Sequence, residues 1–153
     1  MFFIYRLLTN LIFIFSPIII LIRLLKKKEH PTRFKEKFGI YTKKRLEGKL
    51  IWFHGASVGE ILSIVPLIEK LEKKNNIKQI LVTSNTLSSS TILSNLKLKK
   101  TIHQFFPIDT VYHTNKFLRY WKPSMAIFID SEIWPNMINN IKKQSATLIL
   151  INA

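Results

Sequence analysis

Two acidic side chains follow predicted buried strands, which is where the side chains of an α/β domain reach a ligand. Glu60 follows the small-residue run Gly55-Ala56-Ser57-Val58-Gly59, and Glu132 lies two residues after Asp130. A carboxylate in such a place can accept a proton from a substrate hydroxyl, as a general base does. A glutamate in the first turn of a helix also suits the helix dipole, and an acid near a helix start can cap it. Spacing alone leaves both interpretations open.

Other side chains at the same strand ends allow other kinds of site. Thr83, Ser84 and Asn85 follow the second predicted strand, and they can bind sugar or phosphate or cap the next helix. Asp130 and Glu132 resemble the carboxylate pair that holds a divalent ion in some glycosyltransferases. Two carboxylates without a third ligand form a poor metal site, so we predict no metal.

The small-residue run has two further interpretations. Its glycines let a ligand approach the backbone closely, and the free N–H groups of the following helix favour an anion. No Gly-Lys-Ser/Thr follows, so the run is not a phosphate-binding P-loop. Gly55 to Gly59 also matches the Gly-x-Ser-x-Gly pattern of a hydrolase nucleophile. No histidine follows a later strand where a hydrolase needs one, which argues against that class.

Short apolar runs alternate with helical patterns along the rest of the chain, and this alternation predicts a parallel sheet. The predicted strands are Leu50–His54, Gln79–Thr83, Ile102–Phe106, Met125–Ile129 and Thr147–Ile151. The predicted helices are Thr32–Phe38, Ile61–Lys74, Ser88–Asn95, Thr110–Tyr120 and Pro135–Lys143, with Asp109 as a candidate N-cap. The fold class is therefore α/β, with a parallel sheet.

The composition restricts the class of protein. The chain has 153 residues, enough for one α/β domain, and it has no cysteine, which excludes disulfides and thiolate chemistry. Its formal net charge of +15 favours an anionic partner such as membrane headgroups, nucleic acid or a phosphorylated substrate. No nucleic-acid recognition motif is present, so we predict no nucleic-acid partner.

The N-terminal segment is apolar enough to enter a membrane. Residues Leu7–Ile22 carry no charge, and Arg6 and Arg23 flank them. Lys26-Lys27-Lys28 follows, and cationic flanks stay on the cytoplasmic side of a membrane. We predict a membrane anchor with its basic flank over residues 1–28, a globular domain over residues 29–153, and Pro17 as the site of a helix kink.

Several motifs in register resemble the Kdo transferases, which transfer 3-deoxy-D-manno-octulosonic acid. The run Ile51–Glu60 is similar to the signature of that family, and Glu132–Asn136 is similar to its Glu-x-Trp-Pro-Asn element. The other matching segments are Arg33–Gly39, Ile80–Thr86, Phe106–Asp109 and Phe117–Pro123. Their order and spacing agree over nearly the whole chain.

The resemblance implies that the parallel sheet is Rossmann-like and forms the N-terminal, acceptor-binding domain of a GT-B glycosyltransferase. Such an enzyme moves Kdo from CMP-Kdo to a lipid A precursor with inversion, needs no cofactor, and serves lipopolysaccharide biosynthesis. By position, Glu60 matches the general base and Glu132 matches the second acidic residue, which is linked to transition-state stabilisation. Gly55 to Gly59 match the acceptor-facing loop. The implied location is the bacterial inner membrane, with the globular part on the cytoplasmic face.

The resemblance covers only the N-terminal half of the family. We expect the donor domain, which binds CMP-Kdo in the family, to lie outside these 153 residues. We therefore expect either a fragment or one half of a split enzyme whose donor domain is a separate polypeptide. The alternative is a non-catalytic, membrane-anchored fragment that binds anionic lipids.

Overall fold

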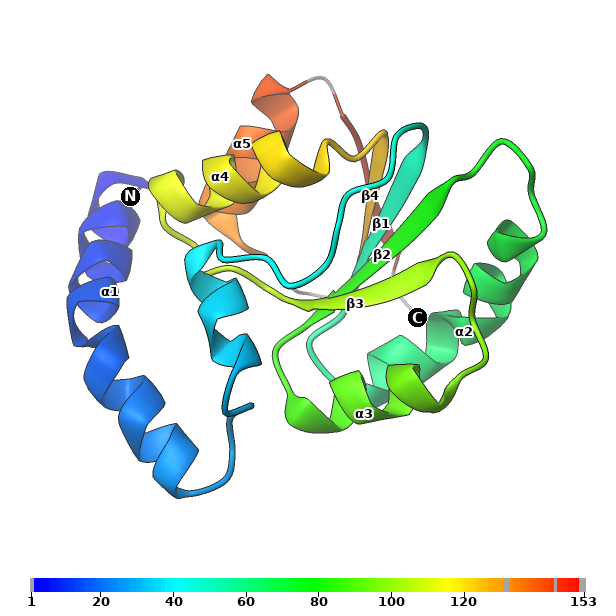
Figure 1. Cartoon of the computed structure of the whole chain (residues 1–153). Coiled ribbons are helices and arrows are strands. Elements are labelled where there is room, and N and C mark those ends of the chain that lie inside the picture. Colours follow the sequence, from blue (N-terminus) through cyan, green and yellow to red (C-terminus); the bar gives the residue numbers. More distant parts are fainter. Residues whose placement is uncertain (1, 131–132, 145, 152–153) are drawn as a thin grey trace.

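Five parallel strands form one sheet with the order β3-β2-β1-β4-β5 in the computed structural model, which describes residues 2–130, 133–144 and 146–151 (Figure 1). The strands are β1 (Leu50–His54), β2 (Gln79–Ser84), β3 (Thr101–Phe105), β4 (Met125–Ile129) and β5 (Thr147–Ile151). The first strand, β1, lies in the middle of the sheet. Strands β2 and β3 follow on one side of it, and β4 and β5 lie on the other side. This is the strand order of a Rossmann-like domain, and it confirms the predicted α/β class.

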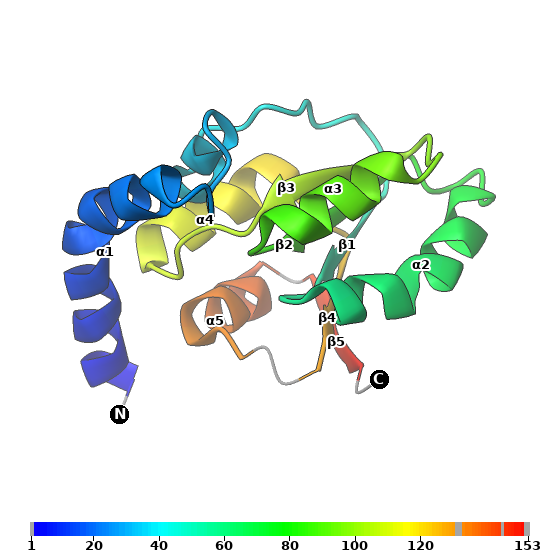
Figure 2. The same cartoon turned by 90° about the horizontal axis from the view of Figure 1, so that it is seen from below.

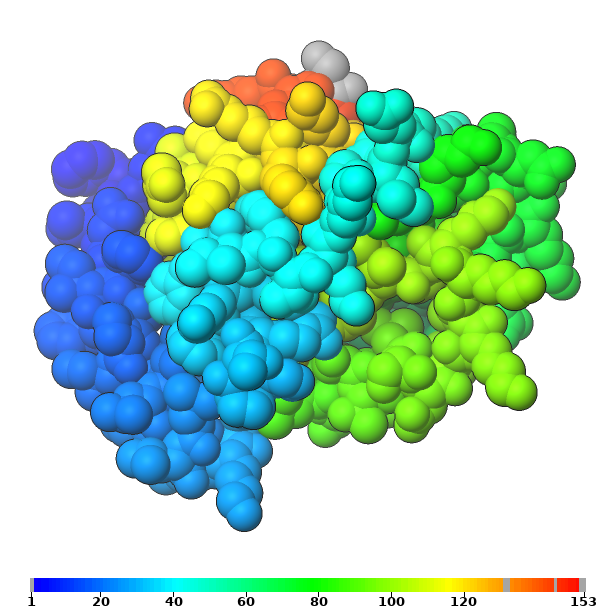
Figure 3. Space-filling model, viewed as in Figure 1, coloured from blue at the N-terminus to red at the C-terminus, as the bar shows by residue number. Residues whose placement is uncertain are grey.

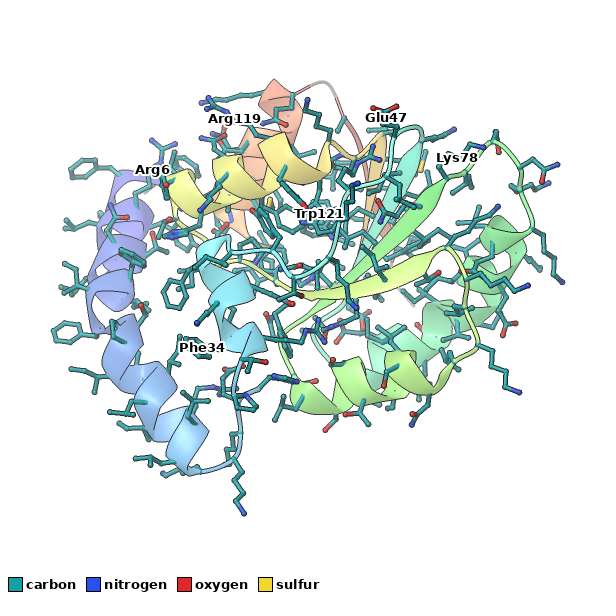
Figure 4. All side chains as sticks on the ribbon, viewed as in Figure 1. Arg6, Phe34, Glu47, Lys78, Arg119 and Trp121 are labelled. Carbon is teal, nitrogen blue, oxygen red and sulfur yellow. The ribbon has the colours of Figure 1, made fainter. Side chains whose placement is uncertain are left out.

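Two helical layers cover the sheet. Helices α2 (Val58–Glu72) and α3 (Leu87–Asn95) lie on one face, and α4 (Val111–Trp121) and α5 (Pro135–Lys143) lie on the other (Figures 1 and 2). The first layer buries Ile61, Ile64 and Ile68 against the sheet. Figure 4 shows Trp121 between α4 and the sheet, where it belongs to the second core. The central strands are apolar on both faces because each face meets a helical layer.

An N-terminal helix, α1 (Phe2–Leu25), lies outside these layers, next to the 3-10 helix η1 (Arg33–Phe38) (Figure 3). Within the described residues, α1 is the one helix that is long and apolar enough to cross a membrane. Its outward side chains, including Leu7, Leu11 and Ile18, are exposed. Pro17 lies inside the helix, and Figure 2 shows that α1 is bent.

The element boundaries differ from the predicted ones where a cap or a turn decides them. Helix α2 begins at Val58 rather than Ile61, because the Ser57 side chain caps it. The predicted helix at 32–38 is a 3-10 helix over Arg33–Phe38, and Gly39, with φ of 73°, is its C-cap. The N-cap of α4 is Thr110, so the expectation for Asp109 was wrong.

Candidate functional site

Glu60 lies in the first turn of α2, at the carboxyl end of β1, with its side chain fixed by its own helix start. The Ser57 hydroxyl donates to Glu60 Oε1 at 2.6 Å, and the Ala56 N–H donates to Oε2 at 2.8 Å. In return, the Glu60 N–H donates to Ser57 Oγ at 3.2 Å. This is a variant of the reciprocal capping box, in which the Glu60 side chain accepts from the Ser57 hydroxyl and the Ala56 N–H instead of from the N–H of the N-cap Ser57. A carboxylate oxygen accepts more than one hydrogen bond, so both oxygens keep capacity for a substrate proton.

Gly55 allows Glu60 to pack this closely against the end of β1. A Cβ atom at position 55 would lie 3.1 Å from Glu60 Cβ and 3.2 Å from Ile61 Cδ1. At Gly59 the closest such contact is Ser57 Oγ at 4.0 Å, so that position has room for a side chain. The two glycines of the predicted acceptor loop therefore differ: a side chain at position 55 would be crowded by Glu60 and Ile61, whereas one at position 59 would not.

His54 ends β1 in a buried hydrogen-bond network at the same edge of the sheet. The Trp134 indole N–H donates to His54 Nε2 at 3.1 Å, so Nδ1 carries the ring proton and faces the Thr83 carbonyl at 3.2 Å. The Trp52 indole donates to Thr83 Oγ1 at 2.9 Å, and the His54 ring stacks on Phe106 at 4.0 Å. This network joins the ends of three strands and orients Trp134.

Ser84 ends β2 on the opposite face of the sheet, in a second buried network. Its hydroxyl contacts His103 Nε2 at 2.8 Å, and Arg33 contacts His103 Nδ1 at 3.0 Å. Burial, and then the Arg33 charge, lower the pKa of His103 to about 3, so this histidine is neutral. Arg33 is paired with the buried Glu36 at 2.8 Å. The network fixes η1 against β3.

The site residues predicted after β2 therefore lie in different surroundings. Thr83 and Ser84 belong to the strand itself and are fully buried, whereas Asn85 lines a cavity. The substrate-binding role of these three residues stays a prediction. Glu132 and its neighbour Ser131 lie outside the described residues.

Asp109 joins three elements, although the sequence suggested only a cap for the helix that follows it. Its carboxylate accepts from the Asn136 and Met137 N–H groups at 3.1 and 2.8 Å, so it caps α5 across space. It also accepts from the Tyr5 hydroxyl of α1 at 2.7 Å. Burial raises the pKa of Asp109, and these three donors partly offset that rise.

The edge cavity lies between α1 and the carboxyl ends of β2, β3 and β4, with a volume of about 620 Å³. One wall is the inner side of α1, with Tyr5, Thr9 and Ile12. The opposite wall comes from the loops after the strands, and it consists of Asn85, Thr86, Phe106, Pro107, Ile108, Asp109 and Trp134. The cavity is therefore largely apolar, with polar groups from the ends of the strands.

Two cations line this cavity, and they share one carboxylate. Lys37 Nζ lies 2.6 Å and Arg23 Nε 3.0 Å from the same oxygen, Glu29 Oε2. Burial alone would raise the pKa of Glu29, but Lys37 and Arg23 outweigh burial and hold it below its usual range. Burial lowers the pKa of Lys37, and the ion pair with Glu29 opposes only part of this shift. The group carries a net positive charge next to the cavity.

Comparison with known proteins decides the family. The model of the 3-deoxy-D-manno-octulosonic-acid transferase (kdotransferase) family matches residues 32–153. The chain belongs to the Kdo transferase family. A Kdo transferase from Rickettsia bellii is 44% identical over 151 residues, covering 97% of this chain and 36% of the relative.

Two other relatives are similar over almost the whole chain. A probable mitochondrial Kdo transferase of Arabidopsis thaliana is 36% identical, and the match covers 99% of this chain and 34% of the Arabidopsis protein. A Kdo transferase of Haemophilus influenzae is 27% identical, covering 95% of this chain and 35% of its own. The chain thus spans about a third of the length of these Kdo transferases.

The sequence did not predict two of the hydrogen bonds at this edge of the sheet. It did not find the pairing of Tyr5 with Asp109, or the link from His54 to Trp134, because both join residues far apart in the chain. The only sequence signal was that each of the four falls near an element end. In the part of the chain that the structure describes, no cluster of three or more metal-ligating side chains occurs.

Proposed function

We propose that the chain is the acceptor-binding part of a GT-B glycosyltransferase that moves Kdo from CMP-Kdo to a lipid A precursor. Glu60 takes the proton from an acceptor hydroxyl, and that oxygen attacks the anomeric carbon of Kdo. CMP leaves with the bonding electrons, and the configuration inverts. One observation supports this most: the Glu60 carboxylate is held by Ser57 and Ala56 at the carboxyl edge of the sheet. A carboxylate oriented in advance is ready to act as a base.

The edge cavity has the chemistry that such an acceptor needs. A phosphorylated, acylated sugar presents anionic phosphate and apolar chains together. Arg23 and Lys37 supply positive charge, and Ile12, Phe106 and Ile108 supply apolar surface, around the same cavity. We propose that the phosphate lies near the two cations and that the acyl chains follow the inner side of α1.

The remaining roles follow from the family. Gly55, Ala56, Ser57, Val58 and Gly59 would face the acceptor, with Asn85 in the cavity wall and Thr83 and Ser84 behind it. Glu132 would stabilise the transition state. The donor CMP-Kdo would bind a second domain, on this or a separate polypeptide, and α1 would hold the protein at the cytoplasmic face of the inner membrane. No metal or cofactor takes part in this proposal.

Reconstitution tests the proposal. The full 153-residue chain would be combined with the corresponding donor part of the Rickettsia bellii relative, and Kdo transfer from CMP-Kdo to a lipid A precursor would be measured. We expect transfer only when both parts are present. Lipid binding without any transfer, under conditions where the intact relative is active, would contradict the proposal and support a non-catalytic lipid-binding fragment.

A further inference from the structure

A second cavity, of about 630 Å³, lies on the outer side of α4 and shares no lining residue with the edge cavity. Three tyrosines (Tyr41, Tyr112 and Tyr120) and two cations (Lys116 and Arg119) line it. We call it the tyrosine pocket. Figure 3 shows its two components next to each other on the viewed face, namely α4 in yellow and the segment after η1 in cyan.

The aromatic part of the tyrosine pocket is built by packing between these two components. The rings of Tyr41 and Tyr120 stack with centroids 4.2 Å apart and an interplanar angle of 23°. The Tyr120 hydroxyl donates to the Lys43 carbonyl at 2.9 Å, which fixes the stack. Tyr112 and Tyr120 lie on the same side of α4 as Lys116, at intervals of four residues, so rings and cation face one space.

The Tyr41 hydroxyl is a buried donor with no hydrogen-bond partner in the described part of the chain. Burial raises the pKa of Tyr41, and the neighbouring phenols raise it further, so the hydroxyl keeps its proton. A buried polar group without a partner costs free energy unless a ligand or water supplies one. The vacant hydrogen bond is therefore a second sign, besides the cavity, of a ligand at this place.

Gly39 brings Lys116 close to that hydroxyl. Its φ of 73° suits glycine, and a Cβ there would lie 2.7 Å from Lys116 Cδ and 3.3 Å from the Tyr41 hydroxyl oxygen. The Lys116 stem thus passes over the bare backbone of Gly39, next to Tyr41. Among the residues that the structure describes, neither Lys116 nor Arg119 forms an ion pair, and no carboxylate lines the tyrosine pocket.

We propose that the tyrosine pocket is a second binding site, separate from the acceptor site, for a phosphate ester of a sugar or polyol. Lys116 and Arg119 bind the phosphate. The Tyr41 hydroxyl is covered in the structure, and it donates to a phosphate oxygen once the neighbouring Lys116 stem turns toward the ligand. Tyrosine rings offer flat apolar faces to the C–H groups of the sugar or polyol. The chemistry is the same for a soluble sugar phosphate and for the polyol headgroup of an anionic phospholipid.

Binding measurements on the full chain test this assignment, in mild detergent for the soluble probe and without detergent for the vesicles. The soluble probe is glucose 1-phosphate, with glucose for comparison, and the lipid probe is phosphatidylcholine vesicles with or without phosphatidylglycerol. The test variant is Lys116→Gln with Arg119→Gln. The matched control is Lys142→Gln with Lys143→Gln, which removes the same charge from exposed positions on α5. Tyr41→Phe removes only the hydroxyl.

We expect the test variant to bind the favoured probe at least about tenfold more weakly than the control variant does. Tyr41→Phe should weaken it by about threefold to tenfold while circular dichroism stays unchanged. A loss seen with glucose 1-phosphate identifies a soluble sugar phosphate, and a loss seen only with phosphatidylglycerol identifies a lipid headgroup. If the test and control variants bind both probes equally, the proposal is wrong. Because Glu60 and the edge cavity are intact in all these variants, this result is independent of Kdo transfer.

Discussion

Asp109 and Glu29 show how single carboxylates connect this chain to its N-terminal helix. Asp109 binds the Tyr5 hydroxyl and two amides of α5, and Glu29 binds Arg23 and Lys37. Each carboxylate is buried, and each has more than one donor. Burying a charge is favourable only when such partners replace water. These two residues therefore determine where α1 lies relative to the sheet, and so they shape the edge cavity.

Replacing Glu29 should destabilise the chain near neutral pH. Glu29→Gln leaves the largely buried Lys37 without a counter-charge and close to Arg23, so we expect a loss of about 1–2 kcal/mol of unfolding free energy. Chemical denaturation of the full chain measures this loss. Glu47→Gln is the matched control, because Glu47 is exposed, and it should change the free energy by less than about 0.5 kcal/mol.

The loss should depend on pH in a definite direction. The folded-state pKa of Glu29 lies below its unfolded value, so its contribution is complete above the unfolded pKa. This contribution disappears as the pH falls through the folded-state pKa, because the wild-type Glu29 is then protonated and neutral, like the glutamine of the variant. The difference between wild type and Glu29→Gln should therefore shrink in acid. A difference that stays constant or grows in acid would rule out this pairing.

Residue types at strand ends could be read from the sequence, but their partners could not. The sequence places Glu60, Thr83 and Asp109 after apolar runs, which is enough to predict one shared edge. It does not reveal that the Thr83 side chain is already hydrogen-bonded to Trp52 and His54. Nor does it reveal that Asp109 caps α5 rather than α4. Those contacts depend on side-chain packing between distant segments, which periodicity does not encode.

At the scale of the element, two local features determine the start of α2. The Ser57–Glu60 capping box sets the first turn, and Gly55 lets that turn approach β1. The strand-to-helix spacing predicted the helix, but the predicted start at Ile61 followed the apolar pattern and overlooked the cap at Ser57. The exact first residue is set by the cap, which is why α2 starts three residues before the apolar pattern does.

The two glycines near this turn should respond to alanine in opposite ways. Gly55→Ala should lower the unfolding free energy by about 1–2 kcal/mol, because the new Cβ crowds Glu60 and Ile61. Gly59→Ala has room and lies in a helix, so it should raise stability by up to about 1 kcal/mol. Thermal unfolding followed by circular dichroism measures both. Equal changes in the same direction would show that the packing at Gly55 does not matter.

At the scale of the whole molecule, α1 is both a wall of the edge cavity and an exposed apolar surface. Its inner side contacts the domain through Tyr5, through Arg6 with Asn136, and through the Phe13 ring, which lies tilted by 48° against the His113 ring with centroids 4.9 Å apart. Figure 4 shows Arg6 at the end of α1 that approaches α4. The sequence predicted an apolar membrane anchor, and this stays a prediction. It did not predict that the inner side of this helix would pack on the domain. That contact comes from the polar residues Tyr5 and Arg6 together with Phe13, and none of the three differs in type from the residues expected in or beside an anchor.

The outer side of α1 should bind membranes. Leu11→Asp places a charge on this exposed apolar side, and we expect vesicle association to fall by at least about tenfold. Leu62→Asp is the control, since Leu62 is similarly exposed on α2. Co-sedimentation with anionic vesicles measures both variants. If Leu11→Asp sediments as wild type does, α1 does not carry the membrane contact.

The most direct test of the account is the transfer rate of Glu60→Gln in the reconstituted enzyme. Glutamine retains the capping box, so the helix start and the melting temperature should stay the same, but the amide cannot accept a proton. We predict a fall in transfer rate of about 10²–10⁴-fold, with Glu69→Gln, on an exposed turn of α2, at the wild-type rate. A Glu60→Gln enzyme that transfers Kdo as fast as wild type would show that Glu60 only caps its helix and that the base lies elsewhere.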